Sequence, residues 1–333
     1  MAGDDRSSLA GTEVQNNGGP GDTAMPEDDI DSGLPAWKTW SLIGLLGTAG
    51  AVGGLALMWL GSGGSADARA YQQLPEARLH IGLIAGQVAF WCIAAGLLLF
   101  WRHELGTTWK IRSTIHQILA SSIALGLLIY VPLTLSLSGG SGSPLTGYHY
   151  RIIAVYWLGL IVVIPALLTL YSIDEGCRDD YPGRKTTGYV EEYFVMRALL
   201  RRVLVIMGVV ISLIVVATGA YFNALRAYRD ADHPKVKVPS QASLLAYGAL
   251  FVAVLVAMFL PVFVGVRQRG DRIVDDDIQL VAPGNAALSD NLDKRLELRK
   301  YLGLEDNLRD QFERSVLVLS PLLTAALSTF LGK

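Results

Sequence analysis

Charged side chains are scarce in this sequence and are missing altogether from several long stretches. Only 17% of the 333 residues are Asp, Glu, Lys or Arg, whereas 51% are hydrophobic. This balance argues against a soluble globular protein, and the mean hydropathy of +0.38 is typical of a chain embedded in a membrane. Cysteine is rare as well. With only Cys92 and Cys177 present, a disulfide framework is excluded.

Six stretches without a charged side chain are long enough to cross a bilayer. A membrane-spanning helix needs about 20 apolar residues, and five of these stretches hold 22 to 29 residues. In lipid only helices and closed barrels satisfy all their backbone groups, and the unbroken runs lack the alternation of barrel strands. We therefore predict an all-α polytopic membrane protein with six transmembrane helices. The predicted spans are 39–61, 79–101, 114–136, 151–171, 203–222 and 243–266.

The remaining residues form three polar regions around the spans. Residues 1–36 carry eight acidic side chains and one arginine, which predicts a disordered acidic tail. In the connection 172–202, apolar residues recur at helical spacing from Tyr189 onward. They predict an amphipathic helix that extends the fifth span, with a partner-docking helix as the alternative. The predicted organisation is a tail (1–36), spans one to four (37–171), a connection (172–202), spans five and six (203–266) and a C-terminal region (267–333).

The C-terminal region reads as two helices after a loop. Asp275–Asp277 are expected in that loop, as a solvated acidic turn. The first helix is expected to begin at Ser289 or Asp290, whose short polar side chains suit an N-cap, and to end at Gly303, which suits a left-handed C-cap. A second helix leads into the hydrophobic segment 315–332. That segment either forms a seventh span or, as we favour from its shortness, lies in the interface or against the bundle.

The distribution of Lys and Arg predicts the orientation. With the N-terminus inside, the segments next to the spans hold 13 Lys and Arg on the inner side and seven on the outer side. Positive residues favour the cytosolic side. We therefore expect a cytosolic N-terminus. The excess of arginine over lysine, 20 against eight, hints at a bacterial source and hence at the bacterial plasma (inner) membrane.

Polar residues inside the predicted spans are few. No Asp, Glu, Lys or Arg lies in any span core, which disfavours coupled ion or proton transport. Gln87 in the second span and His116 and Gln117 in the third are the polar residues of interest. Hydrogen bonding between helices is their simplest role. The alternative is a polar path for a small solute between the two spans.

Glycine is concentrated in the first predicted span. Gly50 and Gly54 form a GxxxG pair, a spacing that allows two helix backbones to approach closely. We expect this face to pack against another helix of the same chain, and self-association is the alternative.

Strings that resemble catalytic or metal motifs lack an essential residue. His103–Thr107 begins like HExxH, but its second histidine is replaced by Thr107. Ser141 lies in a GxSG string similar to that of rhomboid proteases, yet it falls in a linker-like loop and the last span has no histidine to act as its base. The consecutive carboxylates Asp275–Asp277 lack the alternation of a calcium loop. We predict no catalytic residue, no metal site and no cofactor, haem included.

These patterns leave two main functional hypotheses, and a membrane enzyme comes third, with no residue to nominate. The first is a non-enzymatic integral membrane protein that acts as a scaffold, an anchor or an oligomeric effector. Its partners would be the lipid bilayer, a second copy of the chain, or a cytosolic protein bound through 285–333, and nucleic acid is not among them. The alternative is a channel or facilitator for a small neutral or weakly polar solute, with Gln87, His116 and Gln117 along its path.

Overall fold

The computed structural model describes residues 36–60, 64–104, 144–145, 147–178, 186–231, 233–234, 236–278 and 287–304. The predicted third span, 114–136, and the hydrophobic segment 315–332 lie outside these residues, as does most of the acidic tail. Contacts within the chain separate Met1–Thr39 from Trp40–Lys333. The description below concerns the second of these units.

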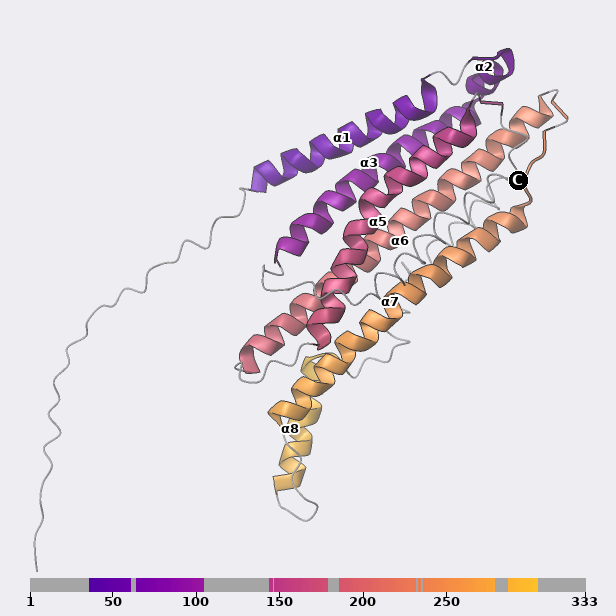
Figure 1. The fold of residues 1–333 in the computed structure, drawn as a ribbon. Coiled ribbons are helices and arrows are strands. Elements are labelled where there is room, and N and C mark those ends of the chain that lie inside the picture. Colours follow the sequence, from indigo (N-terminus) through magenta and orange to yellow (C-terminus); the bar gives the residue numbers. More distant parts are fainter. Residues whose placement is uncertain are drawn as a thin grey trace, which may run out of the picture. The chain divides into compact units, whose positions relative to one another are not determined.

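All regular structure in the described residues is helical (Figure 1). Five of the described helices are long and apolar enough to cross a membrane, which is consistent with a polytopic membrane protein. The candidate spans within them are Trp40–Trp59, Pro75–Trp101, Tyr150–Arg178, Gly188–Asp230 and Ala242–Asp277. The helices are α1 (Ala36–Trp59), α2 (Ala66–Gln73), α3 (Pro75–Glu104), α5 (Tyr148–Arg178), α6 (Thr186–Asp230), α7 (Gln241–Asp277) and α8 (Ala287–Tyr301).

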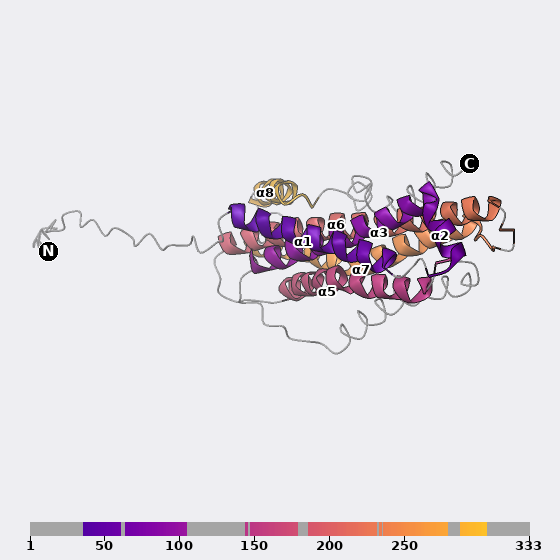
Figure 2. The same ribbon diagram turned by 90° about the horizontal axis from the view of Figure 1, so that it is seen from above.

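Helices α3, α5, α6 and α7 pack into one bundle, in which α6 runs antiparallel to the other three (Figures 1 and 2). At one end, which we name the α8 end, the guanidinium of Arg202 lies 4.9 Å from the centre of the Trp101 ring. At the other end, the α2 end, His80 of α3 contacts Tyr148 of α5 and Ala217 of α6. The end of α3 and the start of α5, which flank the undescribed residues 105–143, thus lie at opposite ends of the bundle.

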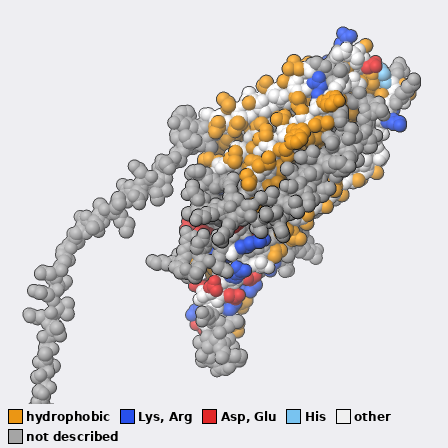
Figure 3. Space-filling view, in the orientation of Figure 1, with side chains coloured by type: hydrophobic (Ala, Val, Ile, Leu, Met, Phe, Trp, Pro, Cys, Tyr) orange, Lys and Arg blue, Asp and Glu red, His pale blue; other side chains and the backbone are white. Residues whose placement is uncertain are grey.

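Apolar side chains face both the inside and the outside of this unit. Trp91 of α3 and Phe251 of α7 are buried, and the Trp91 ring lies 3.2 Å from the position of a Cβ on Gly159 of α5. Large apolar side chains are also exposed, among them Trp40, Leu45 and Trp157. Among the described side chains on the face seen in Figure 3, hydrophobic ones gather in the middle and charged ones lie toward the two ends. Exposed apolar surface of this kind suits contact with lipid.

Glycines allow α1 to pack closely on α3. A Cβ on Gly50 would lie 2.9 Å from the Cα of Ala89, and one on Gly54 would lie 3.0 Å from the Cα of Ala85. These backbones approach so closely that no side chain fits between them. Lipid supplies no hydrophobic drive for helices to associate, so close contact of this kind is a main source of attraction between them.

Helices α6 and α7 extend beyond their uncharged segments at the α8 end. At 1.5 Å per residue the 45 residues of α6 span about 67 Å, more than twice the roughly 30 Å of a hydrocarbon core. Because α6 is one helix from Thr186 to Asp230, the second half of the connection continues directly into the fifth predicted span, 203–222. The loop expected at Asp275–Asp277 is wrong, because these residues form the last turn of α7. Carboxylates at a helix C-terminus oppose the helix dipole, and Arg295 of α8 pairs with Asp275 there.

Of two local features at the ends of the bundle, one was not predicted and the other was. The short helix α2, capped by the Ser65 hydroxyl that accepts from the Ala68 amide at 3.0 Å, is absent from the predicted elements. The left-handed cap at Gly303 is confirmed, with a φ of 66°.

We expect Gly50→Ala to destabilise the protein by about 1 to 3 kcal/mol, because the added methyl group meets the α3 backbone, which cannot rotate away. Gly53→Ala is the matched control, since a Cβ there meets nothing within 4 Å. Apparent melting temperatures in detergent, followed by tryptophan fluorescence, check the difference. Equal melting temperatures for the two variants would contradict the α1–α3 contact.

Candidate functional site

The predicted site residues divide between the bundle and the undescribed part of the chain. Gln87 is buried in the bundle, at 3% exposure. His116 and Gln117 lie outside the described residues, so the polar path stays a prediction. Gly50 and Gly54 face α3 of the same chain.

A polar aromatic cluster centred on His80 lies at the α2 end. The Nδ1 of buried His80 lies 3.0 Å from the Ala217 carbonyl oxygen, and its Nε2 lies 3.3 Å from the Tyr148 hydroxyl. A carbonyl can only accept, so Nδ1 carries the proton and, in the neutral ring, Nε2 accepts from Tyr148. Burial raises the pKa of Tyr148 well above its usual value, which keeps that hydroxyl protonated. Tyr221 stacks on Tyr148 with ring centroids 4.7 Å apart. Both nitrogens of His80 are thus engaged in tying α3 to α5 and α6.

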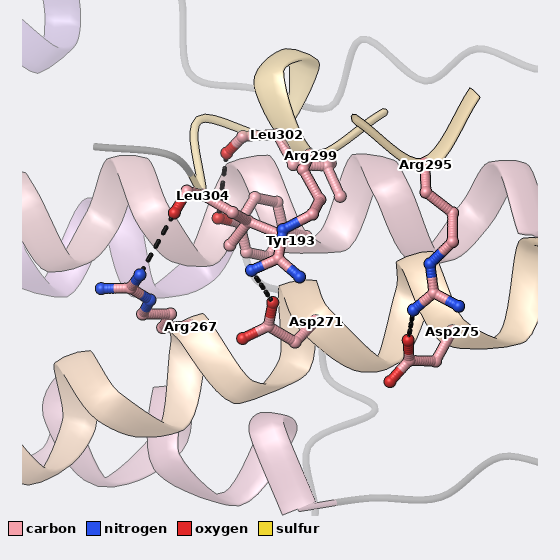
Figure 4. Close-up of polar contacts among 8 residues, drawn as sticks. All are labelled: Tyr193, Arg267, Asp271, Asp275, Arg295, Arg299, Leu302 and Leu304. Atoms are coloured by element: carbon pink, nitrogen blue, oxygen red, sulfur yellow. Dashed lines mark hydrogen bonds and ion pairs between the residues drawn. The ribbon is translucent and has the colours of Figure 1, made fainter. Parts of the chain in front are cut away.

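Helix α8 docks at the opposite end, where its charges match those of α7 (Figure 4). Arg299 pairs with Asp271 at 3.0 Å, and Arg295 pairs with Asp275. Asp271 and Asp275 are four residues apart in α7, and Arg295 and Arg299 are four residues apart in α8. The two aspartates therefore lie on one face of α7, and the two arginines lie on one face of α8. Because the higher-numbered arginine meets the lower-numbered aspartate, α8 runs antiparallel to α7.

Two carbonyl groups just after the C-terminus of α8 are held by side chains from the bundle. The Leu302 carbonyl oxygen accepts from the Tyr193 hydroxyl at 3.1 Å and from Arg197 Nη1 at 2.6 Å, and the Leu304 carbonyl oxygen accepts from Arg267 Nη2 at 3.3 Å. The last carbonyls of a helix lack partners within the helix and carry the negative end of its dipole. The Tyr193 hydroxyl and the Arg197 guanidinium meet both needs at Leu302, the residue that follows the last turn of α8, and Arg267 holds the Leu304 carbonyl just after the cap.

Two glycines make this contact sterically feasible. Gly303 has a positive φ, and the Leu304 amide donates to the Arg299 carbonyl at 2.9 Å, which is the closing bond of a Schellman cap. A Cβ on Gly303 would collide with the Arg197 guanidinium. A Cβ on Gly270 of α7 would lie 2.8 Å from Leu304 Cδ2.

Apolar burial contributes more to the docking of α8 than the ion pairs do. Leu302 and Leu304 are 0% and 3% exposed, and burying a leucine side chain contributes about 1.5 to 3 kcal/mol. The Arg299 and Asp271 side chains are 38% and 37% exposed, and such a pair contributes at most about 1 kcal/mol. The leucines therefore fasten α8, whereas the ion pairs set its register.

Sequence reasoning missed the residues of α6 and α7 that hold α8. One signal was available in the sequence. Two aspartates, Asp271 and Asp275, and two arginines, Arg295 and Arg299, have the same spacing of four residues and opposite charge. No comparable signal marks Arg197 or Arg267, whose partners are main-chain carbonyls. Among the described residues, no group of three or more His, Cys, Asp or Glu is placed to hold a metal ion.

We expect Arg299→Asp to loosen α8, because the new carboxylate faces Asp271. A loss of about 1 kcal/mol raises amide hydrogen exchange in 287–304 roughly fivefold. The double variant Arg299→Asp with Asp271→Arg should restore slow exchange. Lys300→Asp is the control, an equal charge change on the exposed side of α8. Equal exchange in both single variants would contradict the Arg299–Asp271 pair.

Comparison with known proteins adds no relative. Neither protein-family models, nor curated protein sequences, nor solved structures give a match to this chain. The function is therefore inferred from the residues and contacts described above.

Proposed function

We propose that this chain is a non-enzymatic membrane scaffold, which holds α8 at the cytosolic surface of the bacterial plasma membrane and acts by association with a second copy of itself. The observation that carries this proposal is the docking of α8. Arg197 of α6 and Arg267 of α7 bind the carbonyls just after α8, and Arg299 of α8 pairs with Asp271 of α7. A helix of mixed charge is thus held in a fixed place on a membrane-embedded bundle.

The exposed side chains of α8 suit a second copy. Leu292 and Leu296 are 44% and 55% exposed and lie four residues apart, on one face of the helix. Around them both signs of charge are exposed, from Asp290, Asp293, Glu297, Lys294 and Lys300. An apolar centre with both signs of charge around it allows opposite charges to meet when two copies pair about a two-fold axis.

The polar groups at this site support a positioning role over a catalytic one. The Tyr193 hydroxyl and the Arg197 and Arg267 guanidinium groups all donate to main-chain carbonyls of residues 302 and 304. Groups engaged in this way fix a helix in position. A scaffold needs contacts of this kind to present α8, and it does not need a chemical reaction.

The cytosolic placement of the α8 end follows from the positive-inside rule and has its own test. Ser289→Cys places a thiol on the exposed side of α8, and Ala66→Cys places one on α2 at the other end. We expect a membrane-impermeant maleimide to label Ala66→Cys in intact bacterial cells, and Ser289→Cys only after permeabilisation. The reverse pattern would contradict the orientation.

We expect native mass spectrometry of the full-length protein from nanodiscs to show a dimer. Leu292→Glu with Leu296→Glu should convert it to a monomer, because four glutamates would face one another across the two-fold axis. Leu292→Met with Leu296→Met keeps the surface apolar and should preserve the oligomer. A wild-type monomer, or an oligomer that survives the glutamates, would contradict assembly through α8.

A further inference from the structure

A small open cavity lies where α6, α7 and the end of α8 meet. Its volume is about 30 Å³. Leu200, Phe263 and Val266 form its apolar side, and Tyr193, Arg197 and Arg267 form its polar side. A cavity of this size admits water or one small polar group, but not a whole soluble metabolite. Its occupant would therefore be the end of a larger molecule or a small ion.

Two guanidinium groups line this cavity without an acidic partner in the described part of the chain. Arg197 donates to the Leu302 carbonyl and Arg267 to the Leu304 carbonyl. The nearby carboxylate of Asp271 is paired with Arg299. Each guanidinium has five N–H donors, of which a single carbonyl uses only part. Two positive charges with spare donors thus border one opening, and such an arrangement favours an anion.

The cavity lies at the depth where lipid headgroups are expected. Arg267 ends the uncharged run of α7, and Arg201 and Arg202 end that of α6. Beside them the Arg202 guanidinium lies over the ring of Trp101, a residue type that prefers the headgroup zone. Arg197 lies one helical turn beyond Arg201, about 6 Å farther along α6. Phe263 and Val266 of the apolar side lie within the uncharged run of α7, whereas Leu200, Tyr193 and Arg197 lie beyond that of α6. The cavity therefore spans the boundary between the membrane-spanning part and the surface.

We propose that this cavity binds the phosphate group of an anionic membrane lipid. Arg197 and Arg267 donate to the phosphate oxygens, and Leu200, Phe263 and Val266 contact the first carbons of the glycerol and acyl chains. Because the same two arginines hold the carbonyls of residues 302 and 304, a bound lipid stabilises the docked position of α8. This inference is independent of self-association, since Leu292 and Leu296 do not line the cavity.

The first test is lipid retention in native mass spectrometry. The full-length protein is reconstituted in nanodiscs of phosphatidylcholine and phosphatidylglycerol in equal amounts and then released. We expect wild type to retain one phosphatidylglycerol, and Arg197→Gln with Arg267→Gln to lose at least tenfold in retention. Arg201→Gln is the control, because Arg201 is exposed one helical turn from Arg197 and does not line the cavity. Equal retention in all three proteins would overturn the proposal.

A second test uses wild type alone and therefore does not depend on how a variant folds. Amide hydrogen exchange of 287–304 is compared in phosphatidylcholine nanodiscs, in the same nanodiscs with inorganic phosphate, and in nanodiscs with phosphatidylglycerol. Exchange of 66–73 in α2 is the internal reference. We expect α8 to slow at least threefold with phosphatidylglycerol only. Slowing with inorganic phosphate alone, or no slowing in any sample, would overturn a lipid site. The assembly of the protein is read separately from its mass.

Discussion

Every peptide group must find a hydrogen-bond partner where water is absent, and this requirement underlies the rest of the structure. Within hydrocarbon an unpaired amide or carbonyl costs several kcal/mol, so the apolar stretches form helices that satisfy their own backbones. The same requirement returns at the end of α8. There the carbonyls of Leu302 and Leu304 have no partner within the helix, and donors from α6 and α7 supply one. One physical rule thus shapes both the bundle and the helix docked on it.

Helix contacts in this chain depend on small residues and on a few buried polar groups. Gly50 and Gly54 bring α1 against α3, and Gly270 admits Leu304 between α6 and α7. Between the membrane-spanning helices, burial of apolar side chains gains little, because lipid tails are equally apolar, so close packing and hydrogen bonds decide which of them meet. The hydrogen bonds of His80 to Ala217 and Tyr148 serve this purpose at the α2 end.

Charge is arranged by depth at the α8 end. Arg201, Arg202 and Arg267 border the uncharged segments of α6 and α7, and the ion pairs with α8 lie farther out. The arginines therefore place the inferred lipid site at the level of the headgroups, and the ion pairs farther out hold α8 where it is exposed. A phosphate between Arg197 and Arg267 and an α8 surface open to a second copy do not compete, because they use different residues.

Some features of this protein are determined by the sequence itself, because they depend on residues within one or two helical turns of one another. The helical class and the candidate membrane segments follow from uncharged runs such as 203–225, and the end of α8 follows from Gly303, which tolerates a positive φ. The tertiary structure alone decided that Asp275–Asp277 belong to α7 and not to a loop, since the pairing of Asp275 lies 20 residues away in Arg295. It also decided which backbone meets Gly50 and which carbonyl meets Arg197, 105 residues distant. Contacts of that range depend on how helices pack, and hydropathy along a single chain carries no record of it.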